Sequence, residues 1–225
     1  MEGKVIKKYD EKNLPKGLTI QDWNFMRHYF KHDANNPIGD VPEKITIKIK
    51  PTIPKYVDTI INFGCSNCRD LIPFQDDYKL IGFDLVPPDY MDFVSSLNTN
   101  NLTYYQCSIE DYITDFNHDD LDLSKSLVYT SATLMYLEQK DQIKFFNHLI
   151  KFGCKNMVFQ EYKYDSLVLH PKFNPTTDIF NLFNVKPYRE SPLGGLRVDD
   201  LYGHVILDGN NLEKFNEYKN KVCFI

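Results

Sequence analysis

The sequence predicts an α/β fold in which helices cover a mostly parallel sheet. From about residue 57 onward, short apolar runs alternate with stretches of helical periodicity, which is the order that parallel sheets require. The first apolar run ends in Gly64, and the second ends about twenty residues later in Asp84. A glycine and an acidic residue at the carboxyl ends of neighbouring parallel strands are typical of a nucleotide site. Since 225 residues suffice for one such fold, we expect a single domain.

The expected elements follow from apolar runs and helical spacing. Strands are expected at 57–63, 79–84, 102–107, 126–130 and 156–160, and helices near 68–72, at 109–115 and at 138–152. Gly153 stands where the longest helix should stop. A final antiparallel pair of strands is expected at 185–191 and 202–207, with a polar helix at 211–220.

Composition excludes several classes of protein. The chain is 42% apolar, and none of its apolar runs is long enough to span a membrane. The first residues carry charge without a following apolar run, so we expect no secretory signal and a cytoplasmic location. Five cysteines, an odd number, favour a reducing compartment over disulfides. The net charge of −5 and the scattered lysines argue against nucleic acid as a partner.

Four segments carry a resemblance to a known family. Their order and spacing across 55–161 resemble the motifs of class I S-adenosylmethionine-dependent methyltransferases; they are Ile60–Leu71, Leu80–Pro87, Tyr105–Tyr112 and Leu127–Leu137. The resemblance implies a Rossmann-like, seven-stranded, mostly parallel sheet flanked by helices. It also implies a helical lid within 1–50, a cofactor-binding core over 55–161, and an acceptor-side insertion with the final strands over 162–225.

The resemblance also implies roles for individual residues. Asp84 would bind the ribose hydroxyls, Asn62 the methionine part of S-adenosylmethionine, and Arg69 its carboxylate. The expected cofactor-binding residues are Asn62, Gly64, Cys65, Arg69, Asp84, Leu85, Ser108, Ile109 and Thr130. Methyl transfer needs alignment, exclusion of water and in some cases a base. The expected pocket residues are Tyr136, Glu161 and Tyr162, with a small-molecule acceptor and no metal.

Departures from the family pattern leave a second function open. Asn62 replaces an acidic residue, Ser66 and Cys68 replace glycines, and Ser108 stands where an Asp often contacts adenine, with Glu110 and Asp111 close by. A degenerate fold that binds the cofactor without transferring methyl groups fits these changes. An acceptor in protein or RNA also stays open. The segment Thr130–Met135 lacks the Asn- or Asp-Pro-Pro-aromatic motif, which argues against methylation of bases.

Other motifs suggest rival chemistries. Cys65 and Cys68 form a C-x-x-C between a strand and a helix, a setting that favours redox chemistry, although small packed residues in a tight loop explain them too. The acidic stretch 115–122 with His118 resembles a metal loop, or a solvated connection. His170 and His204 follow the fifth strand, where the family builds its acceptor pocket. The aromatic segment 23–30 is either a lid helix or a helix packed on the sheet, and its Arg27 is a second candidate for the carboxylate.

Overall fold

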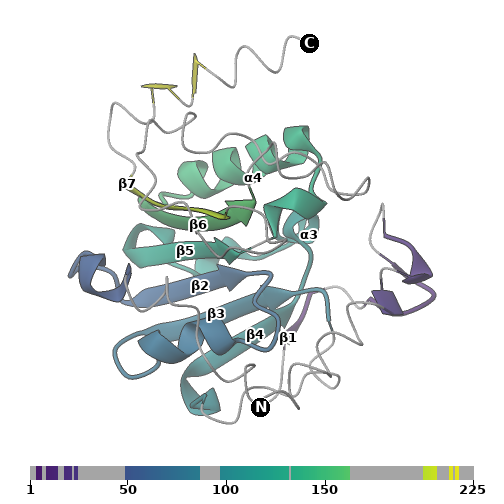
Figure 1. The fold of residues 1–225 in the computed structure, drawn as a ribbon, viewed down its shortest axis with the longest axis horizontal. Coiled ribbons are helices and arrows are strands. Elements are labelled where there is room, and N and C mark those ends of the chain that lie inside the picture. Colours follow the sequence, from purple (N-terminus) through teal and green to yellow (C-terminus); the bar gives the residue numbers. More distant parts are fainter. Residues whose placement is uncertain are drawn as a thin grey trace. The chain divides into compact units, whose positions relative to one another are not determined.

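The structure is a computed structural model of the chain (Figure 1). The residues that it describes are 4–6, 9–14, 18–21, 23–24, 49–86, 97–131, 133–162, 200–206, 213–214 and 216–217. The chain forms two compact units, Met1–Asn117 and His118–Ile225, and each is presented by itself.

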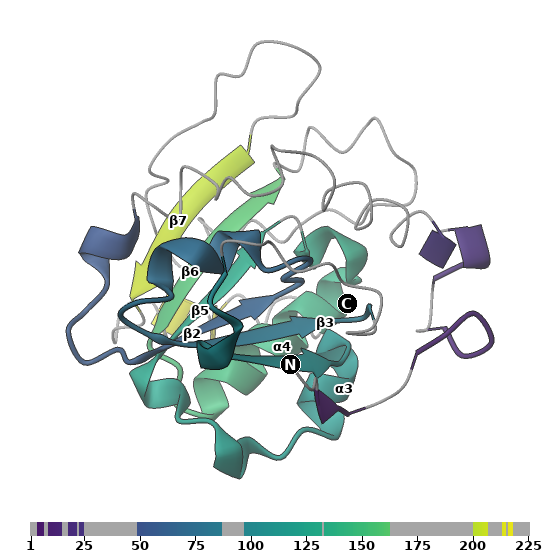
Figure 2. The same ribbon diagram turned by 90° about the horizontal axis from the view of Figure 1, so that it is seen from below.

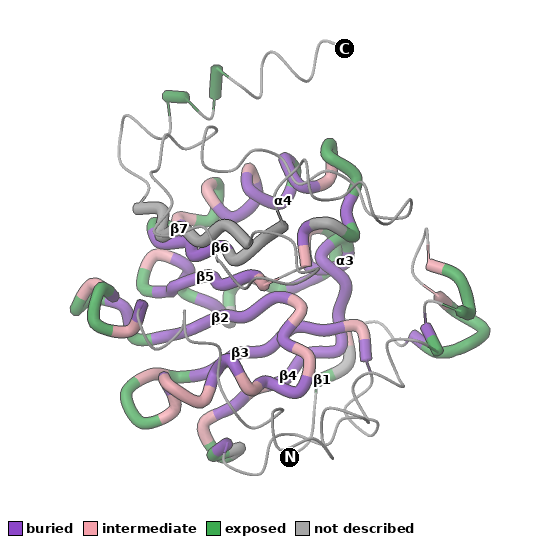
Figure 3. Tube along the Cα trace, viewed as in Figure 1, coloured by how far each residue is buried: buried purple, intermediate pink, exposed green. Residues whose placement is uncertain are grey.

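The described residues of the first unit form four parallel strands. In spatial order they are β1 (Lys4–Val5), β4 (Leu102–Gln106), β3 (Lys79–Asp84) and β2 (Thr59–Phe63). Every residue of β2 and all but the first of β3 are buried, as Figure 3 shows. Strands buried on both faces form continuous apolar runs, and this explains why the sequence predicted them well. The expected strands 79–84 and 102–107 are confirmed, and the strand expected from residue 57 begins at Thr59.

Strand β1 was not predicted. The expectation for residues 1–50 was a helical lid, yet Lys4 lies opposite Tyr105 and Val5 opposite Gln106. The backbone N–H of Ile6 continues this pairing by donating to the Gln106 carbonyl at 3.2 Å. A strand of two residues has too few positions for a hydrophobic period, and its partner lies about a hundred residues away, so no local pattern could indicate it.

The connections that follow β2 and β4 differ in kind. After β2 the chain forms the 3₁₀ helix η2 (Arg69–Phe74), whereas we expected an ordinary helix near Cys68. Cys68 has a left-handed backbone, and Pro73 lacks the N–H that an α-helix would use there, which explains the difference. After β4 comes α3 (Ile109–Thr114), in agreement with the predicted helix, and the Ser108 side chain caps it.

A stack of aromatic rings fixes α3 against the sheet of the first unit. Phe63, Phe83 and Tyr105 lie directly opposite one another on neighbouring strands, with ring centroids 4.7 and 4.9 Å apart. Tyr112 of α3 packs edge-on against Phe63 at 4.7 Å and against Phe83 at 5.1 Å. Such ring pairs add to the apolar area that they bury. These ring contacts therefore fix the position of α3, whose first residues belong to the expected cofactor site.

The second unit contains three described strands and one long helix. Strand β5 (Ser126–Ser131) pairs parallel with β6 (Asn156–Tyr162), which pairs antiparallel with β7 (Asp200–Ile206). Helix α4 (Gln139–Lys151) connects β5 to β6, and the Gln142 amide donates to the carbonyls of Leu134 and Leu137 at 3.0 and 3.1 Å. Figure 2 shows β5, β6 and α4 from below.

Most expected elements of the second unit are confirmed. They include the strands at 126–130 and 156–160, the helix at 138–152 and an antiparallel strand near 202–207. The expected strand at 185–191 lies outside the described residues, as does most of the helix at 211–220. The single seven-stranded sheet and the N-terminal lid stay predictions. Within the described ranges, no helix combines the length and the apolar character needed to cross a membrane.

Two histidines meet at the end of α4. The Nε2 atoms of His118 and His148 are 2.8 Å apart, and the Phe152 ring lies 4.1 Å from the His118 ring and 4.7 Å from the His148 ring. His118 therefore packs against the helix. Where the chain is described, no three His, Cys, Asp or Glu side chains gather as metal ligands. Burial is the largest cause that lowers the pKa of His148, and together with the neighbouring His118 and Lys151 it brings this pKa to about 4.

We expect this histidine pair to make the fold less stable in mild acid. The folded pKa of His148 lies near 4, below its ordinary value of 6.5, so the unfolded chain binds more protons between these pH values. The stabilisation is complete above pH 6.5 and is lost as the pH falls toward 4. Urea unfolding should show a loss of about 1–2 kcal/mol between pH 7 and pH 5 that is smaller in His148→Gln. Lys140→Gln, an exposed change in the same helix, should retain the wild-type loss, and an unchanged loss in His148→Gln would contradict the assignment.

Candidate functional site

The loop after β2 turns sharply back onto β3. Gly64, Ser66 and Cys68 have left-handed backbone angles, with φ of 68°, 50° and 63°. The N–H groups of Gly64 and Cys65 both donate to the Phe83 carbonyl, at 2.8 and 3.2 Å. Residues with a Cβ adopt this conformation at a cost of about 1–2 kcal/mol each, whereas glycine adopts it freely. Ser66 and Cys68, which stand where the motif that this loop resembles has glycines, adopt the backbone conformation that a glycine would favour.

The two cysteines of this loop are packing residues against the backbone of β3. A Cβ added to Gly82 would lie 2.7 Å from the Cys65 sulfur and 3.3 Å from the Cys68 sulfur. Both side chains are buried, and burial, with the neighbouring Cys68 thiol, raises the pKa of Cys65 well above its ordinary value. A redox centre instead needs an accessible thiol of lowered pKa. The geometry therefore favours packing over redox chemistry for the C-x-x-C.

Asp84 joins the ends of three strands. One oxygen of its buried carboxylate accepts from the Ser66 N–H at 2.9 Å, and the other accepts from the Val86 N–H at 3.2 Å. Its backbone carbonyl accepts from the Cys107 N–H at 2.8 Å. Burial raises the pKa of Asp84, while the backbone donors at Ser66, Val86 and Leu85 act in the opposite direction. The side chain expected to bind ribose is thus fixed at the carboxyl end of β3.

Asn62 carries a buried acceptor. Its side chain is 1% exposed, and its Oδ1 atom accepts no hydrogen bond from the described residues. A buried polar atom without a partner costs about 1–3 kcal/mol, so a ligand that donates a hydrogen bond here would be favoured. In the second unit, Thr130 near the end of β5 is fully buried, and its hydroxyl finds no partner in the described parts of the chain either. Both residues were expected at the cofactor site, and both fit a polar ligand.

Hydrogen bonds also occupy the start of α3. The Ser108 hydroxyl accepts from the Asp111 N–H at 2.9 Å and donates to the Asp111 carboxylate at 2.8 Å. The hydroxyl of Tyr9 donates to the same carboxylate oxygen and lies 3.4 Å from the Ser108 oxygen. The Ser108 hydroxyl therefore caps α3 and also holds the Asp111 carboxylate. Of the two substitutes named from the sequence, Glu110 is exposed and Asp111 is buried in this cluster.

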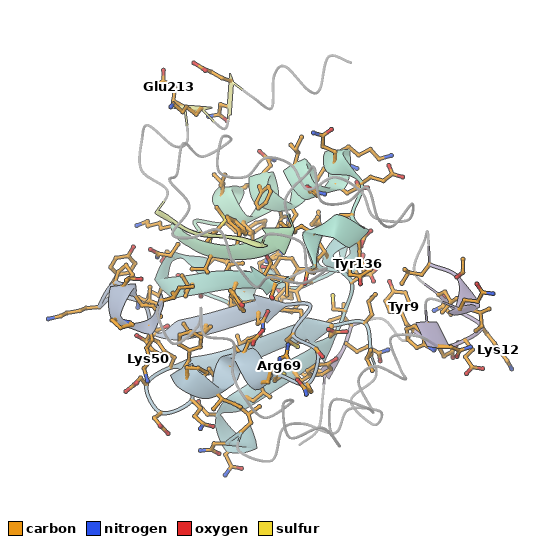
Figure 4. The ribbon with its side chains drawn as sticks, in the orientation of Figure 1. Tyr9, Lys12, Lys50, Arg69, Tyr136 and Glu213 are labelled. Atoms are coloured by element: carbon orange, nitrogen blue, oxygen red, sulfur yellow. The ribbon has the colours of Figure 1, made fainter. Side chains whose placement is uncertain are left out.

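The first unit brings most of the expected cofactor residues together. The ends of β2, β3 and β4 and the segments that follow them carry Asn62, Gly64, Cys65, Asp84, Leu85, Ser108 and Ile109. Arg69 begins η2, and its guanidinium lies 3.8 Å from the Asp70 carboxylate (Figure 4). Tyr9 was missed, because nothing in its local sequence indicates a partner a hundred residues away. The roles assigned to these residues stay predictions.

The remaining candidates belong to the second unit or lie outside the described residues. Tyr136, in the 3₁₀ helix Leu134–Tyr136, is 49% exposed (Figure 4). Glu161 and Tyr162 end β6, as expected, and their side chains are outside the described part of the structure. Arg27 and His170 also lie outside it, and His204 lies in β7 opposite Val158.

Comparisons with solved structures reveal the fold of the chain. It is similar to the N-methyltransferase NodS from Bradyrhizobium japonicum WM9 in complex with S-adenosyl-L-homocysteine, at a TM-score of 0.58 and 12% identity over 80% of this chain and 97% of that one. It is also similar to the 1,6-didemethyltoxoflavin-N1-methyltransferase of Burkholderia thailandensis. The TM-score is 0.54, and the identity is 11% over 83% of this chain and 89% of that one. A third similar structure is that of an S-adenosylmethionine-dependent methyltransferase from Archaeoglobus fulgidus. Its TM-score is 0.53, and the identity is 12% over 82% of this chain and 99% of that one.

These likenesses establish the Rossmann-like α/β fold that S-adenosylmethionine-dependent methyltransferases have. They confirm the coarse fold class that the sequence predicted. No family model matches the chain, and the search of curated proteins found no match.

The contact between Gly82 and the cysteines predicts a specific rescue. Gly82→Ala should destabilise the fold by about 1–3 kcal/mol, because the new methyl group would meet the Cys65 sulfur at 2.7 Å. Adding Cys65→Ala removes that sulfur and should recover about 1 kcal/mol or more in a double-mutant cycle, measured by urea unfolding. Cys154→Ala, a change at a buried cysteine of the second unit, should give no such recovery. Equal coupling in both pairs would contradict the proposed contact.

Proposed function

We propose that the protein is a methyltransferase that uses S-adenosylmethionine and acts on a small molecule. The observation that carries this proposal is the carboxyl edge of β2 and β3. There the Gly64 turn, the fixed Asp84 carboxylate and the buried Asn62 acceptor occur together. The solved structures of similar fold include methyltransferases with bound S-adenosylhomocysteine, and one of them also holds a small-molecule acceptor. That likeness supports both the cofactor and the acceptor class.

The proposed cofactor contacts follow from the donor and acceptor groups present. Asp84 would accept from the ribose hydroxyls, because a carboxylate offers about four acceptor positions and the backbone donors at Ser66, Val86 and Leu85 do not use all of them. Asn62 would accept from the ammonium group of the methionine part, and Arg69 would bind the carboxylate. The turn at Gly64 and the adjoining Cys65 would bring the backbone close to the ligand. The Leu85 and Ile109 side chains would contact the adenine.

The chemistry requires little more from the chain than positioning. When bound, the cofactor supplies a methyl group activated by the sulfonium. The chain must align an acceptor atom with it, exclude water and, for some acceptors, receive a proton. We assign Tyr136, Glu161 and Tyr162 to the acceptor pocket, with Glu161 as the group able to take the proton. Thr130, buried near the end of β5, would contribute a hydrogen bond.

The uncharged Asn62 favours one alternative, a fold that binds the cofactor without transferring methyl groups. Calorimetry separates the possibilities. We expect both S-adenosylmethionine and S-adenosylhomocysteine to bind with a Kd well below 1 mM, which corresponds to a binding free energy more favourable than about −4 kcal/mol. Transfer of a labelled methyl group to a panel of small nucleophiles would then support the enzyme, and binding without transfer to any acceptor would support the alternative. No binding of either compound at millimolar concentration would overturn both.

Asp84 should matter for cofactor affinity. Asp84→Ala removes the proposed ribose acceptor, so we expect the Kd of S-adenosylhomocysteine to rise by a factor corresponding to about 1.5–3 kcal/mol. Circular dichroism and thermal melting should confirm that the variant is folded, since it also loses the bonds to Ser66 and Val86. Asp77→Ala, at an exposed carboxylate before β3, should bind normally. Equal affinity in wild type and a folded Asp84→Ala would exclude Asp84 as the ribose ligand.

A further inference from the structure

The amino-terminal segment is attached to the edge of the candidate site at three points. The Ile6 N–H donates to the Gln106 carbonyl at 3.2 Å. The Gln106 side-chain amide then donates to the backbone carbonyl of Tyr9 at 3.2 Å. The Tyr9 hydroxyl donates to the Asp111 carboxylate. All three attachments lie at or beyond the carboxyl end of β4, where the resemblance places adenine.

The Gln106 amide relates Tyr9 directly to an expected cofactor residue. The same nitrogen that contacts the Tyr9 carbonyl also donates to the Leu85 carbonyl, at 3.1 Å. Gln106 itself is 1% exposed, so this bridge is buried. The backbone of Tyr9 therefore lies beside the loop that follows β3, and its side chain reaches the start of α3. It spans the two segments expected to hold the adenine ring.

Tyr9 also sets the orientation of Asp111. Two hydroxyl groups, from Tyr9 and Ser108, donate to one oxygen of this carboxylate. Tyr9 is 3% exposed and Asp111 5%, so both groups are removed from bulk water. A buried carboxylate depends on its donors, because without them its desolvation is not compensated. Loss of the Tyr9 hydroxyl would leave only one of these two side-chain donors and would loosen the carboxylate.

The chemistry of this cluster matches one feature of adenine. The exocyclic amino group of adenine donates hydrogen bonds, so its recognition requires an acceptor. The Ser108 hydroxyl is committed to the helix cap, whereas a carboxylate has about four acceptor positions and can hold two hydroxyl groups and a ligand together. A purine with an oxo group at the same position presents an acceptor there in place of the donor, so a carboxylate that binds the amino group would lose that hydrogen bond.

We propose that Tyr9 is a positioning residue for the adenine end of the site, acting through Asp111 to select a purine that carries an amino group. This inference rests on the proposed function, since it assumes that an adenosine-containing cofactor binds. It makes the amino-terminal segment part of the binding site. A purely structural role, in which Tyr9 only anchors that segment, would weaken all ligands equally.

The test compares S-adenosylhomocysteine with S-inosylhomocysteine, in which an oxo group replaces the amino group, by calorimetry. We expect the wild type to bind S-adenosylhomocysteine at least tenfold more tightly. In Tyr9→Phe this preference should fall below about threefold, because affinity for S-adenosylhomocysteine drops while affinity for S-inosylhomocysteine stays within about twofold. Tyr78→Phe is the matched control. It removes one hydroxyl before β3, at the opposite end of that strand, and should retain the wild-type preference.

The outcomes separate this inference from the proposed function. If the wild type binds neither compound, the proposed function fails. If the wild type binds both equally, or if Tyr9→Phe retains the full preference or loses affinity for both compounds alike, only the role of Tyr9 is overturned. Asp111→Asn, which keeps the side-chain size, provides a second route should Tyr9→Phe unfold. It should reduce the preference in the same way, and an unchanged preference in it would equally reject the inference.

Discussion

The candidate site depends on how the loop after β2 returns to the end of β3. Three consecutive N–H groups of this loop, at Gly64, Cys65 and Ser66, donate to acceptors at Phe83 and Asp84. These bonds place a backbone turn and a buried carboxylate side by side at one edge of a parallel sheet. Open α/β sheets bind ligands at this edge, because the strands end there and leave polar groups to be satisfied. The aromatic stack on β2, β3 and β4 holds the three strand ends in register.

The sequence was informative where a residue's role is determined by its neighbours in the chain. Fully buried parallel strands gave long apolar runs, and the spacing between Gly64 and Asp84 follows from the length of one strand–helix–strand unit. The capping role of Ser108 also has a local signal, since an acidic residue follows it three positions later. The coarse fold class and the placement of the expected residues at the ends of β2, β3 and β4 could therefore be predicted.

The features that the sequence did not indicate depend on contacts between distant residues. Strand β1 and the Tyr9–Asp111 hydrogen bond connect positions about a hundred residues apart, and His118 meets His148 across thirty. Periodicity is a property of a single element, so it carries no information about such pairs. The short helix η2 was misjudged for a different reason. Its amino end is set by the left-handed Cys68, a conformation that propensity does not favour for cysteine.

The residues that differ from the methyltransferase motif that this loop resembles do not all bear on function in the same way. Ser66 and Cys68 adopt left-handed backbone angles that are strained for residues with a Cβ. The strain is offset because the Ser66 N–H donates to the Asp84 carboxylate and the Cys68 sulfur packs near Gly82. The loop therefore keeps its shape without the glycines. Asn62 differs because it changes charge and not conformation. An amide there can still accept a hydrogen bond from an ammonium group, yet it provides no full negative charge for a cationic ligand. A ligand bound at the carboxyl ends of β2 and β3 would instead meet the Asp84 carboxylate, which backbone donors hold in place. Burial raises the pKa of Asp84. A donor from the ligand would favour its ionised form, so binding and ionisation of Asp84 should support each other.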